Sequence, residues 1–406
     1  MKKRVVITGI GVVSSLGNNQ DNIIRNIKNN IINYKFYEID EKIAAIPILE
    51  FNIRDYIKRN KFLRYLNQGA KFSVSAAIMA VKNSKLDKKM LNDAGLFVSS
   101  GPNLDISGPN LDIISDNKNN YELINNNFQA LWILQFLPNT AGSLISQITG
   151  IHGDNQTICT ACSASIQAIG EAFRKVRDGY LKIALAGGGD SRLSVGGLLA
   201  YNKANALWKG NDDPLNSYYI FDKRHSGFIP GEGGAFFVIE EMDHAMQRKA
   251  EIFAEVIGYG SSISGHSMTA PHPQGIWEEK ALIQALKDSD LNSEEIEIIS
   301  AHGTGTNLND VMESNLIQKL FGNKPFVIAL KSWIGHLASA CGAVELAISI
   351  GLLKNNYLPR IRNLKLLCNE NINYVIKDIY NYSGKTMLIE NFGFGGQNAA
   401  LIIKVE

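Results

Sequence analysis

The feature of this sequence that most restricts its fold is an alternation, along almost the whole chain, of short β-branched runs with longer segments of helical periodicity. Segments such as 68–83 and 279–288 have helical spacing and lie between runs that read as strands. Alternation of this kind is typical of βαβ units, which build a largely parallel sheet covered by helices on both faces. The predicted strands are residues 4–13, 94–101, 155–160, 181–187, 233–240, 251–264, 296–303, 324–332 and 398–406.

The chain length points to two similar halves. One core rarely serves 406 residues, so two domains or a duplicated unit are expected. The first strand carries Gly9-x-Gly11 with two serines after it, and Gly258-x-Gly260 with two serines forms an echo later in the chain. We therefore predict an N-terminal half, 1–249, and a C-terminal half, 250–406. A shorter repeat, GPNLDI at 101–106 and again at 108–113, lies in an Asn-rich segment and is given no chemistry.

Charge and cysteine usage exclude several classes of protein. The 41 Lys and Arg nearly balance the 39 Asp and Glu, so no electrostatic footprint for nucleic acid or acidic lipid is present. Four cysteines cannot form a disulfide scaffold at this size, which favours a reduced, cytoplasmic compartment. The apolar stretch 337–353 contains Glu345, whose charge would be costly in lipid, so we expect a buried helix and no membrane insertion.

Cys162 is a candidate nucleophile. It follows the predicted strand 155–160 and precedes a run of helical spacing that Gly179 ends. The unpaired N–H groups and the dipole at a helix N-terminus favour a thiolate over a thiol. Two other interpretations stay open from the residues alone: a buried structural cysteine, and a redox or metal pair with Cys159.

Two histidines and a lysine follow two further predicted strands. His302 begins a glycine-rich loop, and Lys331 and His336 precede the apolar helix that contains Glu345. An acid on an apolar helix needs a partner, and Lys331 is the natural one. Ligands of open parallel sheets bind beyond the carboxyl ends of the strands, so these groups are expected to gather near Cys162. The alternative is that both histidines are structural and that the ion pair serves only the core.

The last glycine-rich loop, 391–398, supplies backbone N–H groups in close approach, as an oxyanion site requires. The glycines do not form a GxGxxG pattern, and the turn after the first strand reaches only GxGxxS, so a nicotinamide-binding oxidoreductase stays as an alternative. A cysteine, two histidines, a lysine and an N–H-rich loop at strand ends are typical of thioester chemistry with a stabilised carbanion.

The motifs that contain these residues resemble those of the β-ketoacyl-acyl-carrier-protein synthases I and II. The resemblance runs in family order from the first strand to the last and covers nearly the whole chain. The matching motifs are Thr160-Ala-Cys-Ser163, Ala301-His-Gly-Thr-Gly-Thr306, Lys331-Ser-x-x-Gly-His336 and Phe392-Gly-Phe-Gly-Gly396, with Phe221-Asp222, Gly227-Phe228 and Gly231-Glu-Gly233.

The resemblance implies a thiolase-like α/β fold, with two similar βα halves in a five-layer αβαβα arrangement. It implies an acyltransferase that performs a decarboxylative Claisen condensation. Cys162 would accept an acyl group, and malonyl-carrier protein would supply the attacking carbanion. His302 and His336 would assist decarboxylation, and Lys331, paired with Glu345, would order them. The family positions also imply that Thr304, Thr306 and Gly395 bind substrate and that Phe394 is a gate and an oxyanion N–H donor.

The same resemblance implies the partners. Acyl and malonyl thioesters would arrive on the phosphopantetheine arm of an acyl carrier protein, so no metal and no separate cofactor is expected. The synthases of this family are homodimers, and a heterodimer with a paralogue is the alternative. A non-catalytic partner subunit, similar to a chain-length factor, is the second functional hypothesis, although such subunits usually lack the nucleophile that Cys162 provides.

Four positions depart from the family pattern. His225 and Ser226 replace a usual Arg-Asp, Gln397 replaces a usual Thr, and Trp333 is bulky beside Lys331. These departures leave open whether the chain serves primary fatty-acid synthesis or a specialised polyketide or polyene pathway.

Overall fold

The computed structural model describes residues 2–39, 41–105, 130–210 and 213–405. The second copy of the GPNLDI repeat lies outside these residues. The strands and helices of the first part of the chain are β1 Val5–Ser14, α1 Gln20–Lys28, β2 Lys35–Glu38, β3 Lys42–Ala45, α2 Gln68–Ser84, α3 Lys88–Leu91, β4 Gly95–Ser99, α5 Thr140–Thr149, β5 Asn155–Ile158, α6 Ala164–Arg177, β6 Ile183–Ser191, α7 Val195–Lys203, α8 Pro214–Ser217, β7 Glu232–Glu241 and α9 Met242–Gln247.

The second part repeats this alternation. Its elements are β8 Ala254–Ile263, α10 Ile276–Ser289, β9 Ile298–Ser300, α11 Asn307–Phe321, β10 Phe326–Ile328, α12 Lys331–Ile334, α13 Cys341–Lys354, β11 Tyr357–Leu358, β12 Ile379–Tyr380, β13 Thr386–Gly393 and β14 Gln397–Lys404. No helix in the described parts of the chain is both long and apolar enough to cross a bilayer. The apolar stretch forms α13, which is buried along nearly its whole length, as the sequence predicts.

The main sheet is symmetric about its centre. Its strand order is β10-β9-β13-β14-β8-β1-β7-β6-β4-β5, and β1 meets β8 over only three residue pairs. On each side of that junction, two antiparallel pairings are followed by two parallel ones. The expectation of a largely parallel sheet is therefore wrong: the inner strands run antiparallel, and only the outer strands form βαβ-like parallel pairs.

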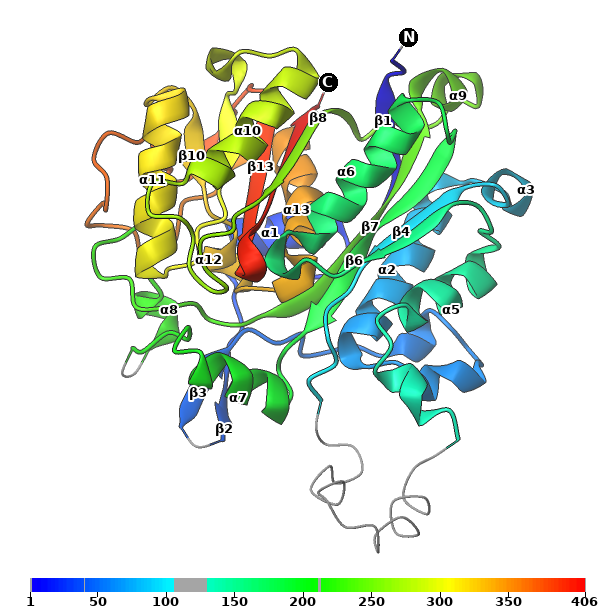
Figure 1. Ribbon diagram of the computed structural model, residues 1–406, viewed down its shortest axis with the longest axis horizontal. Coiled ribbons are helices and arrows are strands. Elements are labelled where there is room, and N and C mark those ends of the chain that lie inside the picture. Colours follow the sequence, from blue (N-terminus) through cyan, green and yellow to red (C-terminus); the bar gives the residue numbers. More distant parts are fainter. Residues whose placement is uncertain (1, 40, 106–129, 211–212, 406) are drawn as a thin grey trace, which may run out of the picture.

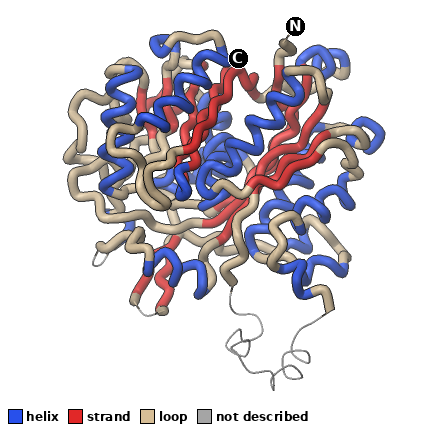
Figure 2. The backbone as a smooth tube through the Cα atoms, viewed as in Figure 1, coloured by secondary structure: helices blue, strands red, loops and turns tan. Residues whose placement is uncertain are grey.

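Five layers result (Figures 1 and 2). Helices α2 and α5 cover the outer face of the first half of the sheet, and α10 and α11 cover the outer face of the second. Helices α6 and α13 lie between the two halves, where they share the largest apolar core with β1, β7 and β8. This is the α/β, five-layer arrangement expected for a thiolase-like fold.

The repeated Gly-x-Gly pattern of β1 and β8 is explained by helix packing. A methyl group at Gly9 or Gly11 would collide with the backbone of α2 at Ala80 and Ala76, and one at Gly258 or Gly260 would collide with α10 at Ala285 and Ala281. In each half a helix therefore packs directly on strand backbone, which only glycine permits. The equivalence supports a duplicated unit, while the boundary at residues 249 and 250 stays a prediction.

Candidate active site

The nucleophile candidate lies on a sharp turn between β5 and α6. A single 3₁₀ turn, Ala161–Ser163, joins the two, and Ala161 has φ +48°, a conformation that costs a non-glycine residue energy. Glycine at 393 makes room for the turn, since a Cβ there would lie 3.0 Å from the Cys162 nitrogen. The turn thus points Cys162 toward the loop that follows β13.

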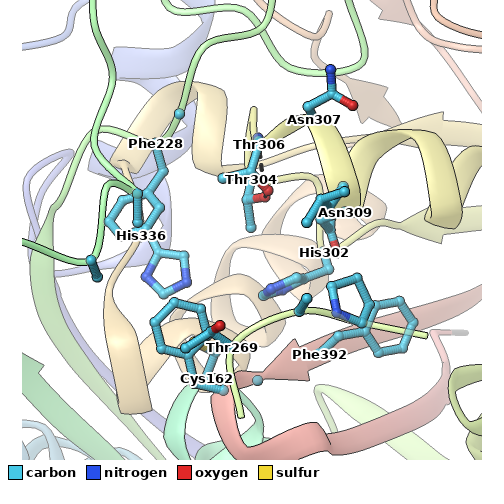
Figure 3. A pocket seen from close by; sticks show the side chains of 18 of the residues that line it. Cys162, Phe228, Thr269, His302, Thr304, Thr306, Asn307, Asn309, His336 and Phe392 are labelled. Atoms are coloured by element: carbon cyan, nitrogen blue, oxygen red, sulfur yellow. Dashed lines mark hydrogen bonds between the residues drawn. The ribbon is translucent and has the colours of Figure 1, made fainter. Parts of the chain in front are cut away.

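Cys162, His302 and His336 converge as predicted. The sulfur and one ring nitrogen of each histidine lie within 4.8 Å of one another, and Figure 3 shows both imidazoles directed into the same pocket. His302 follows β9, and His336 follows α12, so the two strand-end loops do meet. The S,N,N donor set has a spacing that a soft metal ion would also accept. The absence of a metal therefore stays a prediction.

The hydrogen bonds fix the tautomers of both histidines. Lys331 Nζ lies 3.2 Å from His302 Nδ1, and the Ala338 N–H donates to His336 Nδ1 at 3.1 Å. An ammonium and an amide are donors only, so each Nδ1 is an acceptor and each Nε2 has the proton. Burial and the Lys331 charge lower the pKa of His302 well below its usual value and that of His336 to about 3. The site therefore presents two neutral N–H donors.

Lys331 and Glu345 form a fully buried ion pair. Lys331 Nζ is 2.6 Å from Glu345 Oε1 and donates to the His302 carbonyl at 2.6 Å. Burial would lower the pKa of Lys331, but the Glu345 carboxylate raises it above its usual value, so the lysine is charged. Asn391 donates to the other Glu345 oxygen at 2.9 Å and lies 3.4 Å from His302 Nδ1. The Lys331–Glu345 pair thus holds both the ring and the carbonyl of His302 in place.

Burial of Cys162 opposes the thiolate that its position at a helix N-terminus was expected to favour. Burial is the largest influence and raises the pKa of Cys162 to about 11, although the Lys331 charge and the Phe394 N–H act in the opposite direction. The resting group is a thiol. The N–H groups of both Cys162 and Phe394 lower this pKa, as donors directed toward a sulfur do, but burial outweighs them.

A second layer of acids supports the His302 loop. Glu313 accepts from the N–H groups of His302 at 2.5 Å and Gly303 at 2.8 Å, and Asp310 accepts from those of Thr304 and Gly305. Both acids lie near the N-terminus of α11, with Asp310 in its first turn, and from there they hold the loop backbone through contacts that sequence spacing does not reveal.

Two cavities meet at the cysteine. The first, which we call the threonine cavity, has about 430 Å³ and is lined by Thr304 and Thr306, whose hydroxyls lie 2.8 Å apart. The second, which we call the arginine cavity, has about 390 Å³ and is lined by Arg192 and also by Gly395. Both cavities share Cys162, Phe228, His336 and Phe394. Gly395 therefore lines a different cavity from Thr304 and Thr306, although all three were expected to bind substrate.

The remaining residues singled out from the sequence line one of the two cavities or lie in the core. Phe394 is 39% exposed where the two cavities meet, and its role as a gate stays a prediction. His225 and Ser226 line the threonine cavity, and Gln397 lines the arginine cavity. Trp333 is fully buried and donates to the Arg360 carbonyl at 3.0 Å, so it fills the core rather than the pocket.

The cysteines other than Cys162 do not all belong to the core. Cys341 is buried, Cys368 is half-buried, and Cys159 is exposed, so only Cys341 of these three is a core residue. Sequence reasoning also missed two residues of the site. Asn391 is a partner of both Glu345 and His302. Phe228 stacks on His336, with the two ring centroids 4.6 Å apart. Phe228 belongs to the Gly227-Phe228 motif that matched the family, and this match could have marked it as a site residue.

Glu390 gives a first prediction. Its side chain is fully buried beside Glu313, and burial and that neighbour raise its pKa well above the usual value. The folded state therefore keeps a proton that the unfolded state loses, and stability falls as pH rises from the ordinary glutamate pKa through the folded one. Glu390→Gln removes this loss, so at pH 8 it should be more stable than the parent by about 1–3 kcal/mol.

Urea unfolding at pH 5 and pH 8 measures the effect. The gain should shrink at pH 5, because this pH lies closer to the ordinary glutamate pKa and ionisation there stabilises the unfolded parent less than at pH 8. The exposed Glu370→Gln serves as control and should leave the pH dependence unchanged. An equal pH dependence for Glu390→Gln and the parent would contradict a raised pKa of Glu390 in the folded state.

Comparisons with known proteins agree with this site. Residues 51–245 match the family model "Beta-ketoacyl synthase, N-terminal domain", and residues 253–365 match "Beta-ketoacyl synthase, C-terminal domain". A 3-oxoacyl-[acyl-carrier-protein] synthase 2 from Synechocystis sp. is 31% identical and covers 99% of this chain and 98% of the relative. A synthase 1 from Buchnera aphidicola is 30% identical, covering 99% of each chain.

Solved structures are similar over the full length. A β-ketoacyl synthase from Burkholderia phymatum superposes with TM-score 0.88 and 27% identity, and both chains are covered completely. The structure described as the ishigamide ketosynthase/chain length factor gives TM-score 0.87 and 25% identity, again with complete coverage.

Proposed function

The chain belongs to the β-ketoacyl synthase family, and we propose that it joins an acyl group held on Cys162 to a two-carbon unit from a malonyl thioester. The observation that carries this proposal is the convergence of Cys162, His302 and His336 where two cavities meet. As a 3-oxoacyl-[acyl-carrier-protein] synthase, it is an acyltransferase whose product is a 3-oxoacyl thioester.

In the first stage, the Cys162 sulfur attacks the carbonyl carbon of an acyl thioester. The N–H groups of Cys162 and Phe394 stabilise the oxyanion that forms. The new S–C bond replaces the old one, and the thiol proton ends on the departing pantetheine sulfur. Thr304 and Thr306 line the threonine cavity and offer hydroxyls to the pantetheine arm.

In the second stage, the malonyl thioester carbonyl accepts from the Nε2–H groups of His302 and His336. The C–C bond to the carboxylate breaks and carbon dioxide leaves. The electron pair of that bond stays on the thioester as an enolate, which the two histidine N–H donors stabilise. The enolate carbon attacks the acyl group on Cys162 and releases the sulfur, which regains a proton. Lys331 and Glu345 act as positioning residues for His302.

The partner is an acyl carrier protein, which brings both thioesters, so the reaction needs no separate cofactor. We propose that two copies of the chain form a dimer. Strand β5 is an edge of the main sheet with exposed Asn155 and Gln156, whereas the opposite edge, β10, bonds to residues 373 and 375. An unpaired edge is a ready site for another strand. A paralogue on the same edge would give a heterodimer.

The proposal predicts a two-step mass change. Incubation of the whole chain with acyl-carrier protein should add one acyl mass to Cys162, and malonyl-carrier protein should then remove it as a 3-oxoacyl product. Intact mass spectrometry followed by peptide mapping measures both steps. Failure of a broad acyl panel to modify Cys162 would contradict the proposal. It would favour a non-catalytic partner subunit, for which Cys162→Ala would not change the output of the assembly.

A further inference from the structure

His225 is a histidine of the threonine cavity to which the two-stage reaction gives no part. It lies on the segment between α8 and β7, and its ring lines the same cavity as Cys162 and Thr304. The side chain is only 5% exposed. The Gly227 N–H donates to the Gly305 carbonyl at 2.8 Å, so the segment of His225 is bonded directly to the loop that carries the two threonines.

One ring nitrogen of His225 faces an acid inside the protein. Nδ1 is buried without a hydrogen bond among the described residues and lies 3.8 Å from Asp310 Oδ2. Asp310 accepts from the Phe221 N–H at Oδ2 and from the Thr304 N–H at Oδ1. Burial raises the pKa of Asp310, while the Phe221 bond and the His225 ring act in the opposite direction. An acceptor oxygen beside Nδ1 favours the tautomer with the proton on Nδ1.

The other ring nitrogen is open to the cavity. Within the described residues no group bonds His225 Nε2, yet Nε2 is not one of the buried polar atoms that lack a partner, so it keeps accessible surface. The ring borders the threonine cavity, which makes Nε2 the nitrogen that a ligand there can reach. In the neutral ring with its proton on Nδ1, Nε2 is an acceptor only.

The pantetheine arm of a thioester carries the complementary group. It contains two secondary amides, and each amide has an N–H that needs an acceptor when it leaves water. The Thr304 and Thr306 hydroxyls, 2.8 Å apart, can donate or accept, whereas the neutral His225 ring offers only an acceptor. It therefore suits an N–H of the arm rather than a carbonyl. A ring that is already oriented loses little freedom when the arm binds.

We propose that His225 Nε2 accepts an amide N–H of the pantetheine arm, with Asp310 as the residue that positions the ring. His225, one of the four departures from the family pattern, thereby becomes a substrate-binding residue of this chain. The inference rests on the proposed function, because the arm enters the cavity only when a pantetheine thioester is the substrate.

The test compares two hexanoyl thioesters on the full chain. One is the thioester of pantetheine, and the other is the thioester of ethanethiol, which has the same reacting carbonyl and no amide. Intact mass spectrometry gives the second-order rate constant of Cys162 acylation for each, and the ratio of the two constants is the preference for the arm. A general loss of reactivity lowers both constants and leaves this ratio unchanged.

Two variants separate the two ring nitrogens. The amide of asparagine reaches the position of Nδ1, and that of glutamine reaches the position of Nε2. His225→Asn should keep a group beside Asp310 and lower the preference for the arm about fivefold, the effect of one neutral hydrogen bond. His225→Gln should keep a preference within about twofold of the parent. An unchanged preference in His225→Asn, or an equal loss in both variants, would overturn the proposal.

His152→Asn provides the matched control. His152 is exposed and does not line the threonine cavity, so the same substitution there should keep the parent preference. Urea unfolding shows whether each variant retains the fold. Should His225→Asn fail to fold, His225→Gln decides: a preference within about twofold of the parent supports the contact at Nε2, and a loss of about fivefold overturns it.

The two proposals fail in distinguishable ways. Acylation of Cys162 with the same preference in His225→Asn as in the parent would overturn only the role of His225. If no thioester acylates the parent chain while iodoacetamide still alkylates Cys162, the proposed function itself fails, and the role of His225 fails with it.

Discussion

Replacement of Cys162 by Ala should reduce 3-oxoacyl formation by at least about 10⁴-fold, the scale of loss found when a covalent nucleophile is removed. Acyl transfer to the protein should disappear entirely. Release of carbon dioxide from malonyl-carrier protein should continue, because the Nε2–H donors of His302 and His336 and the Lys331–Glu345 pair do not depend on the sulfur. Product formation, acyl mass and carbon dioxide are measured on the same preparation.

His302→Ala provides the complementary variant. It should keep acylation of Cys162 and lose decarboxylation, since it removes one of the two donors to the enolate. Cys368→Ala, which alters a half-buried cysteine beside Tyr374, serves as a control for cysteine loss and should retain both steps. Parallel loss of acylation and decarboxylation in Cys162→Ala would contradict the separation of roles.

The second large effect concerns Lys331. Among the described residues, Lys331→Met leaves the buried Glu345 carboxylate with only Asn391 as a side-chain donor, and breaking one member of a buried ion pair costs about 3–5 kcal/mol. We expect that loss in the free energy of unfolding, together with loss of decarboxylation. Urea unfolding and carbon dioxide release measure the two effects.

The double variant Lys331→Met/Glu345→Gln separates stability from positioning. It removes both charges, so most of the lost stability should return, while the decarboxylation rate should stay low because His302 Nδ1 has lost its ammonium partner. Removal of the Lys331 charge also raises the pKa of His302, so the acid limb of the pH–rate profile should move to higher pH. Arg248→Met, which breaks the remote Glu240 pair, should lower stability without moving that limb. Recovery of full activity in the double variant would contradict the positioning role.

Much of the site could be predicted from sequence because its residues follow strands directly. Cys162, His302 and His336 each lie in a loop near the carboxyl end of a predicted strand, and the fold brings those loops together. Strand direction was harder to predict. Strands such as β7 and β14 are covered on both faces, so they read as continuous apolar runs whether their neighbours are parallel or antiparallel.

Strand β13 was missed for a related reason. It contains Glu390 and Asn391, which interrupt an apolar run, yet both are completely buried, Glu390 beside Glu313 and Asn391 as a donor to Glu345. Polar residues that serve a buried network look like loop residues when only composition is considered. The protonation of Cys162 was also out of reach, because the helix N-terminus is visible in the sequence while the depth of burial is not.

The glycine contacts of β1 and β8 have a consequence for how the molecule tolerates change. Where helix backbone rests on strand backbone, no side chain lies between them to be repacked, so the spacing of the layers does not depend on rotamers. Sequence drift elsewhere can alter surfaces and cavities while both contacts keep the same dimensions. Solved structures that share 27% and 25% of this chain's residues superpose on it with TM-scores of 0.88 and 0.87, so the layered frame persists while most side chains change.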